Sequence, residues 1–150
     1  MKTVLAPIDF SKVSRRVVNT AVDLARLLQA RVVLLHAVSA PAADLAALAS
    51  RSGRLPKTPD RAARKHLARW QRELAEHRIA VATRCATGVP AVAILRAAGE
   101  VRANFIVLGP HGHRVSEPRT LGTTAGGVLA GVSCPVVVIP APRPRRKRAK

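Results

Sequence analysis

Hydrophobic and polar positions along the chain fall into two kinds of segment. Short aliphatic runs, typical of buried strands, are separated by longer segments in which apolar residues recur every three to four positions, as in amphipathic helices. The aliphatic runs predict strands at 3–8, 31–38, 79–87, 104–108 and 135–139. The helical spacing predicts helices from 11 to 28, over 60–78, from 90 to 98 and over 122–132, with a weaker helical stretch inside a loop at 40–58.

Strands and helices therefore alternate along the whole chain, beginning and ending with a strand. Such alternation is typical of a parallel sheet with right-handed crossovers, so we expect an α/β fold with helices on both faces. Two strand orders are common for five-stranded open sheets, the flavodoxin-like and the Rossmann-like, and both have their reversal next to strand 1. We expect the order 3-2-1-4-5. Ligands of such sheets bind at that reversal, between the carboxyl ends of strands 1 and 4.

Several residues predict how the elements begin and pack. The hydroxyl of Ser11 is expected to cap the first helix, and Pro90 suits the first turn of another. Trp70 shares an apolar helix face and is predicted to anchor the core rather than to stack on a base. In the helix that begins at Pro90, the side chains expected to point inward are those of Val92, Ile94, Leu95 and Ala98.

The amino-acid composition restricts the kinds of protein to which the chain can belong. The chain has 150 residues, of which 48% are hydrophobic and only 2% aromatic, so one domain with an aliphatic core is expected. Cys85 and Cys134 lack C-x-x-C spacing, and strands at opposite edges should keep them apart. No apolar run approaches the roughly 20 residues that span a bilayer. We expect a cytoplasmic protein without membrane contact.

The charge is strongly basic and unevenly distributed. Lys and Arg number 26 against 8 acidic residues, a net charge of +18, and the last eight residues contain six of these positive charges. We expect a domain over 1–141 and a disordered basic tail over 142–150. The tail would attract nucleic acid without sequence preference and in a salt-dependent way, or it reflects only an arginine-rich composition. Both interpretations remain open.

A glycine-rich segment provides the candidate chemistry. It runs from Gly109 to Thr124, after the strand at 104–108 and before the next helix. Glycine lets the backbone approach a ligand closely, and the free N–H groups at a helix N-terminus attract anions. Asp9, at the end of strand 1, would face this segment across the reversal of the sheet. The pattern predicts a phosphate site opposite a carboxylate.

Other nucleotide and metal chemistries fit the sequence less well. No G-x-x-x-x-G-K-[ST] motif is present, and no G-x-G-x-x-G follows the first strand, so neither a P-loop nor a dinucleotide site is expected. His111 and His113 form an H-x-H pattern but lack further clustered ligands, so no metal site is predicted. Hydrolysis of ATP would require a base and a positioned water. We expect no catalytic residue, and slow ATP hydrolysis at most.

Five motifs together carry a resemblance to a known family. They are A-P-I-D-F-S at 6–11, V-V-L-L-H-A-V at 32–38, G-V-P-A at 88–91, the spacing G-x-x-G, nine residues, then G-T at 109–123, and C-P-V-V-V-I-P at 134–140. The chain resembles the universal stress protein family over about residues 2–140. The glycine spacing is similar to that of members that bind ATP, and the fold implied is similar to that of adenine nucleotide alpha hydrolases.

This resemblance implies a set of site residues. Asp9 would bond the ribose or adenine, the backbone at Ala37 would meet the adenine, and the loop and helix N-terminus would hold the phosphates of ATP, with or without Mg²⁺. Pro110 lacks a backbone donor at this loop, which bears on affinity rather than on the identity of the ligand. The complete set is Pro7, Ile8, Asp9, Ala37, Leu108, Gly109, His111, Gly112, Gly122, Thr123 and Thr124.

Two functional hypotheses follow. The first is a cytoplasmic ATP-binding regulatory protein of the stress response, and the resemblance also implies a homodimer paired through the last strand, Val136 to Ile139. The second is a nucleotide-independent dimeric interaction protein, or a basic nucleic-acid-binding protein that acts through its tail.

Overall fold

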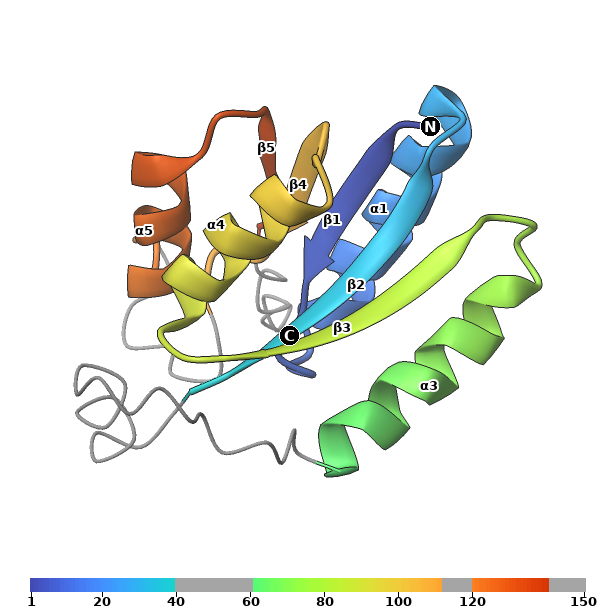
Figure 1. Cartoon of the computed structure of the whole chain (residues 1–150), viewed down its shortest axis with the longest axis horizontal. Coiled ribbons are helices and arrows are strands. Elements are labelled where there is room, and N and C mark those ends of the chain that lie inside the picture. Colours follow the sequence, from blue (N-terminus) through green and yellow to red (C-terminus); the bar gives the residue numbers. More distant parts are fainter. Residues whose placement is uncertain (40–60, 112–119, 141–150) are drawn as a thin grey trace, which may run out of the picture.

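The computed structural model describes residues 1–39, 61–111 and 120–140, and strands and helices alternate throughout these ranges (Figure 1). The strands are β1 (Thr3–Pro7), β2 (Arg31–Val38), β3 (Val81–Thr87), β4 (Phe105–Leu108) and β5 (Val136–Val138). The helices are α1 (Ser14–Leu28), α3 (Arg61–Ala75), α4 (Pro90–Glu100) and α5 (Thr123–Gly131). The weak helical stretch expected at 40–58 and the tail at 142–150 lie outside the described residues.

All five strands are parallel and form one sheet in the order β3-β2-β1-β4-β5. This confirms the order expected from the sequence. The central strand β1 pairs with β2 on one side and β4 on the other, so that Leu5 lies opposite both Val33 and Ile106. Strands β2 and β3 lie on one side of β1, and β4 and β5 lie on the other. The strand order therefore reverses at β1, which places the carboxyl ends of β1 and β4 at the switch point.

Helices cover both faces of the sheet, and alternate residues of each strand supply the two cores. Val4 and Ala6 of β1 pack in the core that α1 and α3 cover, whereas Leu5 packs in the core under α4 and α5. These three side chains have no exposed surface. Because a parallel strand is buried on both faces, its residues read as a continuous apolar run rather than as an alternation.

Two glycines allow α5 to lie close to α4. A Cβ at Gly127 would come within 2.8 Å of the Ala91 Cβ, and a Cβ at Gly131 would come within 2.7 Å of a Leu95 methyl carbon. The two glycines are four residues apart, as are their partners on α4, so they form one strip of contact. This contact sets the position of the α5 N-terminus at the switch point.

The start of α1 differs from its prediction. The helix begins at Ser14, and its N-cap residue, Val13, makes no side-chain capping bond. Ser11 was expected to cap it, which is wrong. Instead, the backbone N–H of Ser11 donates to Asp9 Oδ1. The Asp9 carboxylate organises the turn before the helix, and α1 begins three residues later than predicted.

The inward face of α4 also differs in part. Val92 was expected to be buried but is 55% exposed, whereas Ala93 and Ala97 are buried beside Ile94. The sequence pattern of α4 is apolar on nearly every side, so spacing alone did not identify its buried face. Trp70 of α3 is half-buried and packs against the core, as predicted.

Cys85 and Cys134 form no disulfide, as predicted from their strands. Cys85 lies in β3 and Cys134 precedes β5, so they belong to opposite edges of the sheet. Partial burial raises the pKa of the Cys134 thiol.

In the part of the chain that the structure describes, no helix has the length and apolar character needed to cross a membrane.

Candidate functional site

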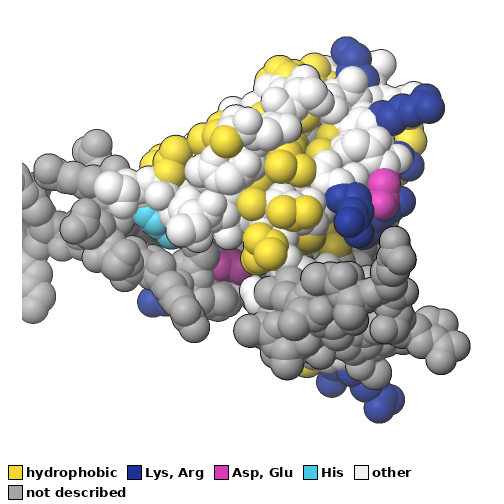
Figure 2. All heavy atoms as spheres, turned by 60° about the vertical axis from the view of Figure 1, so that its left-hand side comes forward, with side chains coloured by type: hydrophobic (Ala, Val, Ile, Leu, Met, Phe, Trp, Pro, Cys, Tyr) yellow, Lys and Arg dark blue, Asp and Glu magenta, His cyan; other side chains and the backbone are white. Residues whose placement is uncertain are grey.

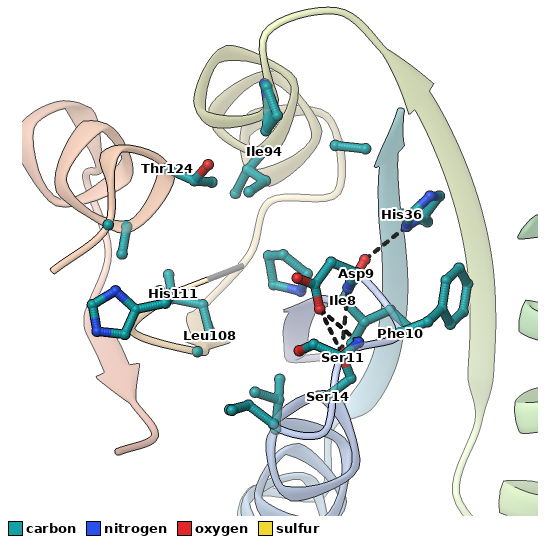
Figure 3. A pocket seen from close by; sticks show the side chains of 18 of the residues that line it. Ile8, Asp9, Phe10, Ser11, Ser14, His36, Ile94, Leu108, His111 and Thr124 are labelled. Carbon is teal, nitrogen blue, oxygen red and sulfur yellow. Dashed lines mark hydrogen bonds between the residues drawn. The ribbon is translucent and has the colours of Figure 1, made fainter. Parts of the chain in front are cut away.

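A cleft of about 830 Å³ lies at the carboxyl ends of β1 and β4, where the strand order reverses. Its volume is in the range of small-molecule sites. The walls come from the segment after β1, the end of β2, the start of α4, the segment after β4 and the N-terminus of α5 (Figure 3). The position agrees with the general rule for ligands of open α/β sheets.

Asp9 is held in a fixed orientation on one side of the cleft. Its Oδ1 accepts two hydrogen bonds of 2.9 Å, one from the backbone N–H of Ser11 and one from the hydroxyl of Ser14. The Asp9 backbone N–H lies 3.3 Å from the Ser14 oxygen. Ser14 is only 2% exposed, so this arrangement is protected from water. The carboxylate therefore stays in place before any ligand arrives.

Phe10 follows in a left-handed backbone conformation, with φ at 63°. A bulky residue rarely adopts this conformation, which costs energy and is often found at functional sites. The conformation directs the Phe10 ring toward His36, with 4.6 Å between ring centroids. His36 is itself fixed by a 2.9 Å contact between its Nδ1 and the carbonyl oxygen of Ile8. Together these contacts form the rim of the cleft beside β2.

The segment after β4 forms the opposite wall and depends on close packing at two glycines. A Cβ at Gly109 would lie 3.1 Å from a Val13 methyl carbon, and a Cβ at Gly122 would lie 3.3 Å from the Pro110 carbonyl oxygen. The Gly122 N–H donates to that same oxygen at 2.7 Å. Neither glycine has a positive φ, so they serve close approach rather than an unusual backbone conformation.

The N-terminus of α5 opens into the cleft. Gly122 is the N-cap residue, and no side chain caps the helix or places an acidic group in its first turn. The first intrahelical bond is that from the Gly126 N–H to the Gly122 oxygen, so the N–H groups of 123–125 have no partner inside the helix. These groups and the helix dipole give this wall a positive potential. Thr123 and Thr124 add hydroxyls beside them.

The cleft thus has two chemically different walls. Figure 3 shows Asp9, Ser11 and Ser14 on one side and His111 and Thr124 on the other. Among the described lining residues Asp9 is the one carboxylate, and none is Lys or Arg. Binding of an anion on the α5 side would therefore use backbone N–H groups and hydroxyls. Within the described ranges no group of three His, Cys, Asp or Glu residues could hold a metal ion.

A family model for the universal stress protein family matches residues 1–140. The chain belongs to the universal stress protein family. Among curated relatives, universal stress protein MJ0531 of Methanocaldococcus jannaschii is 29% identical over 145 residues, which cover 95% of this chain and 84% of the relative.

Solved structures share the fold of this universal stress protein. The hypothetical protein MJ0577 matches with a TM-score of 0.76 and 21% identity, over 95% of this chain and 98% of the other. The universal stress protein from Archaeoglobus fulgidus in complex with dAMP matches with a TM-score of 0.68 and 20% identity, over 92% and 97% of the two chains. Proteins of this fold thus include one solved with an adenine nucleotide.

The structure brings most of the expected site residues of this universal stress protein together in the cleft. Ten of the eleven line it, and the eleventh, Gly112, lies outside the described residues. The ten are Pro7, Ile8, Asp9, Ala37, Leu108, Gly109, His111, Gly122, Thr123 and Thr124.

Sequence reasoning missed several lining residues. Ser14 orients Asp9, Phe10 and His36 form a rim, and Ile94 of α4 closes the cleft above. The D-F-S-x-x-S spacing is a signal that would have indicated Ser14, since a hydroxyl five residues after an Asp can reach it across a turn. The contribution of Ile94 had no local signal because it depends on how α4 crosses the sheet.

Proposed function

We propose that this universal stress protein binds ATP in the cleft at β1 and β4. The observation that carries the proposal is that a preoriented carboxylate, Asp9, faces an uncapped helix N-terminus, that of α5, across a cleft of about 830 Å³. A nucleotide presents a hydroxylated sugar at one end and a polyanion at the other. The two walls match these two ends in chemistry.

Each wall then has a role in the proposal. Asp9 accepts hydrogen bonds from the ribose, and the apolar side chains of Ile8 and Leu108 contact the nucleoside. Backbone N–H groups and hydroxyls of Thr123 and Thr124 hold the phosphates. Mg²⁺, when present, would be held by the phosphates and water, since Asp9 is committed to the sugar. A relative of the same fold solved with dAMP supports an adenine nucleotide as the ligand class.

We further propose that the protein responds to the nucleotide rather than consuming it. Hydrolysis requires a base and a positioned water near the γ-phosphate. The hydroxyls and backbone donors of the α5 wall stabilise phosphate but do not remove a proton from water. Binding would then alter a surface beside the cleft that partners contact, as expected of a cytoplasmic stress-response regulator.

The proposal is tested by thermal unfolding with and without 1 mM ATP. A micromolar site is stabilised by about 4 kcal/mol at such an excess of ligand. Thr124→Val, which removes a hydroxyl from the cleft, should reduce the shift in Tm. Thr83→Val, in β3 and outside the cleft, is the matched control and should leave the shift unchanged. A wild-type protein whose Tm does not respond to ATP, ADP or AMP would refute the proposal.

The last strand supports a second proposal, that of a homodimer. β5 pairs only with β4 in the described chain, and its residues Val136–Val138 are half-buried. An apolar edge strand tends to pair with another chain, and a second β5 would satisfy its backbone groups. Sedimentation velocity at micromolar concentration should give the mass of a dimer. A monomer at 100 µM would contradict it.

The nucleic-acid hypothesis for the tail stays a prediction, because residues 142–150 lie outside the described part of the chain. Deleting residues 143–150 distinguishes it from the nucleotide hypothesis. ATP stabilisation should survive the deletion if the cleft is the site, whereas contact with nucleic acid through the tail should be lost.

A further inference from the structure

Helix α3 carries an unusual stripe of positive charge on its outer face. Arg61, Lys65, Arg69 and Arg72 follow one another at intervals of four, four and three residues, and all four are exposed. Residues at these spacings lie on one side of a helix. We call these four residues the α3 stripe. The 15 residues of α3 extend about 22 Å at 1.5 Å per residue, so the stripe runs along most of this length.

The spacing of these charges and the place of Arg61 in the first turn are unfavourable for the helix, whereas Arg72 lies in the last turn, where the helix dipole favours a positive charge. Like charges three or four residues apart repel one another. Arg61 and Arg64 lie in the first turn, where the helix dipole disfavours positive charge, and no acidic residue offsets them there. Glu73 of the same helix pairs with Arg15 of α1, beside α3 rather than on the stripe. The repulsion within the stripe and the place of Arg61 therefore oppose the stability of α3, which suggests that the stripe serves contact with an anionic partner.

Overall composition does not explain the stripe, because the other face of the same molecule lacks it. Helices α4 and α5 together contain one basic residue, Arg96, and one acidic residue, Glu100. Figure 2, which brings the α5 side forward, shows hydrophobic and neutral side chains over the centre of that face and blue side chains at its margins. An arginine-rich composition would affect all helices alike. Helix α1 contains three arginines against one acidic residue and α3 five basic residues against one, so the positive charge lies on the face that these two helices cover and is densest on α3.

The chemistry of the stripe favours nucleic acid over a membrane surface. A helix that lies on a membrane needs large apolar side chains next to its basic ones. Leu67 and Leu74 of α3 are buried in the core, and no large hydrophobic residue of α3 is exposed. Three of the four stripe residues are arginines, whose guanidinium groups bind phosphate oxygens in pairs.

The stripe also favours a duplex over a single strand. Recognition of single strands relies on aromatic side chains on which bases stack. The aromatic residue of α3, Trp70, is covered by the Arg15 guanidinium, 4.8 Å from its ring centroid, and contacts Phe10 at 6.3 Å. A straight row of cations without a stacking surface fits the phosphate backbone of a double helix. We infer that the α3 stripe is a contact surface for the phosphate backbone of duplex DNA, bound without sequence preference.

The inference is tested with the full chain and a 20-base-pair duplex of mixed sequence, by fluorescence anisotropy over a series of NaCl concentrations. The stripe variant is R61Q/K65Q/R69Q/R72Q. The slope of log K against log salt is negative, and each lost phosphate contact reduces its magnitude by about 0.9. The stripe variant should therefore have a slope shallower by about 3 to 4, with at least a roughly tenfold loss of affinity at 100 mM NaCl. The ATP-induced shift in Tm should not change, because the cleft is untouched.

Two control variants remove the same charge elsewhere. K12Q/R16Q/R96Q/R102Q disperses the loss over the surface, and R145Q/R146Q/K147Q/R148Q places it in the tail. Each should reduce the magnitude of the salt slope by less than the stripe variant does. Equal effects of the dispersed and stripe variants would mean that the attraction depends on net charge alone, and this would overturn the inference. So would an unchanged slope in the stripe variant.

Two further measurements distinguish damage to the fold of α3 from a wrong inference. The variant R61K/R69K/R72K keeps every charge and should bind the duplex within about threefold of the wild type, which shows that helix α3 tolerates substitution. Vesicles with 30% phosphatidylserine serve as the competing anionic surface. Stripe-dependent binding to these vesicles that is tighter than binding to the duplex would assign the surface to membranes and overturn the inference.

Discussion

Phe10 has a backbone conformation that glycine adopts more readily than any other residue. Its φ of 63° lies in the left-handed region, where a Cβ is unfavourable by about 1 to 2 kcal/mol. Its ring nevertheless contacts His36, His66 and Trp70, with centroid distances of 4.6 to 6.3 Å. The ring contacts thus offset a backbone cost, and they connect the rim of the cleft to α3.

This balance predicts an unusual order of stability for two substitutions. Phe10→Gly and Phe10→Ala lose the same ring contacts, but only the alanine retains the Cβ. The glycine variant should therefore be the more stable of the two by about 1 kcal/mol, the reverse of the usual order. Urea unfolding of both variants measures the difference. An alanine variant at least as stable as the glycine variant would contradict the strained conformation of Phe10.

The two serines after Asp9 should differ in their contribution to stability. Ser14 donates its hydroxyl to Asp9 Oδ1 in a buried setting, so Ser14→Ala should cost about 1 to 2 kcal/mol. Ser11 interacts with the same oxygen through its backbone, which Ser11→Ala leaves intact, so that change should cost less than about 0.5 kcal/mol. Chemical denaturation of both variants gives the comparison. A larger cost at Ser11 would restore the capping role expected from the sequence.

At the scale of elements, two adjacent glycines of α5 differ in the free space around them. A Cβ at Gly126 would meet nothing within 4 Å, whereas a Cβ at Gly127 would meet the Ala91 Cβ at 2.8 Å. Gly126→Ala should stabilise the protein by about 0.5 to 1 kcal/mol through helix propensity. Gly127→Ala has the same gain but must push α5 away from α4, at a cost of about 1 to 3 kcal/mol.

The measurement is the Tm of the two alanine variants, with Gly99→Ala of α4 as a second open position. We expect Gly126→Ala and Gly99→Ala to raise the Tm and Gly127→Ala to lower it. Because α5 presents its N-terminus to the cleft, Gly127→Ala should also weaken ATP stabilisation. Similar Tm values for the variants at 126 and 127 would mean that α4 and α5 are less closely packed than described.

The same elements show what the sequence could and could not predict. The strands of the sheet and their order followed from aliphatic runs and their alternation with helices, because burial on both faces requires such runs. The start of α1 did not follow, because the side chain of Asp9 competes with the helix for the backbone around Ser11. The buried face of α4 did not follow either, since Val92 and Ala93 are both apolar and only the packing of the folded chain distinguishes them.

At the scale of the whole molecule, the cleft combines parts that are distant in sequence. Asp9 and the segment from Gly109 could be placed opposite each other from the strand order alone, because parallel strands end at one edge. Ile94 and His36 could not, because their contribution depends on how a helix crosses the sheet and where a strand ends relative to its neighbour. Sequence motifs thus identified the residues whose chemistry suits a sugar and a phosphate, whereas the residues of the rim are brought to the cleft by the tertiary structure.

The net charge of +18 gives the last prediction. Positive charges concentrated on one molecule repel one another in the folded state more than in the expanded unfolded chain. Raising NaCl from 20 to 300 mM shortens the screening length from about 20 Å to below 8 Å, so this repulsion weakens. The ion pairs Arg15–Glu73 and Arg84–Glu100 are exposed and should lose less than is gained. Stability should therefore rise with salt, with a Tm higher by a few degrees, roughly the effect of 1 kcal/mol in a chain of this size.

Urea rather than guanidinium chloride is the denaturant for this test, because guanidinium is itself a salt. The stripe variant R61Q/K65Q/R69Q/R72Q is the internal control, since it removes four of the repelling charges. Its stability at 20 mM NaCl should exceed that of the wild type, and its response to added salt should be smaller. A wild-type Tm that falls with salt would mean that attractive pairs outweigh repulsion, and the positive charge on α3 would then carry no cost to the fold.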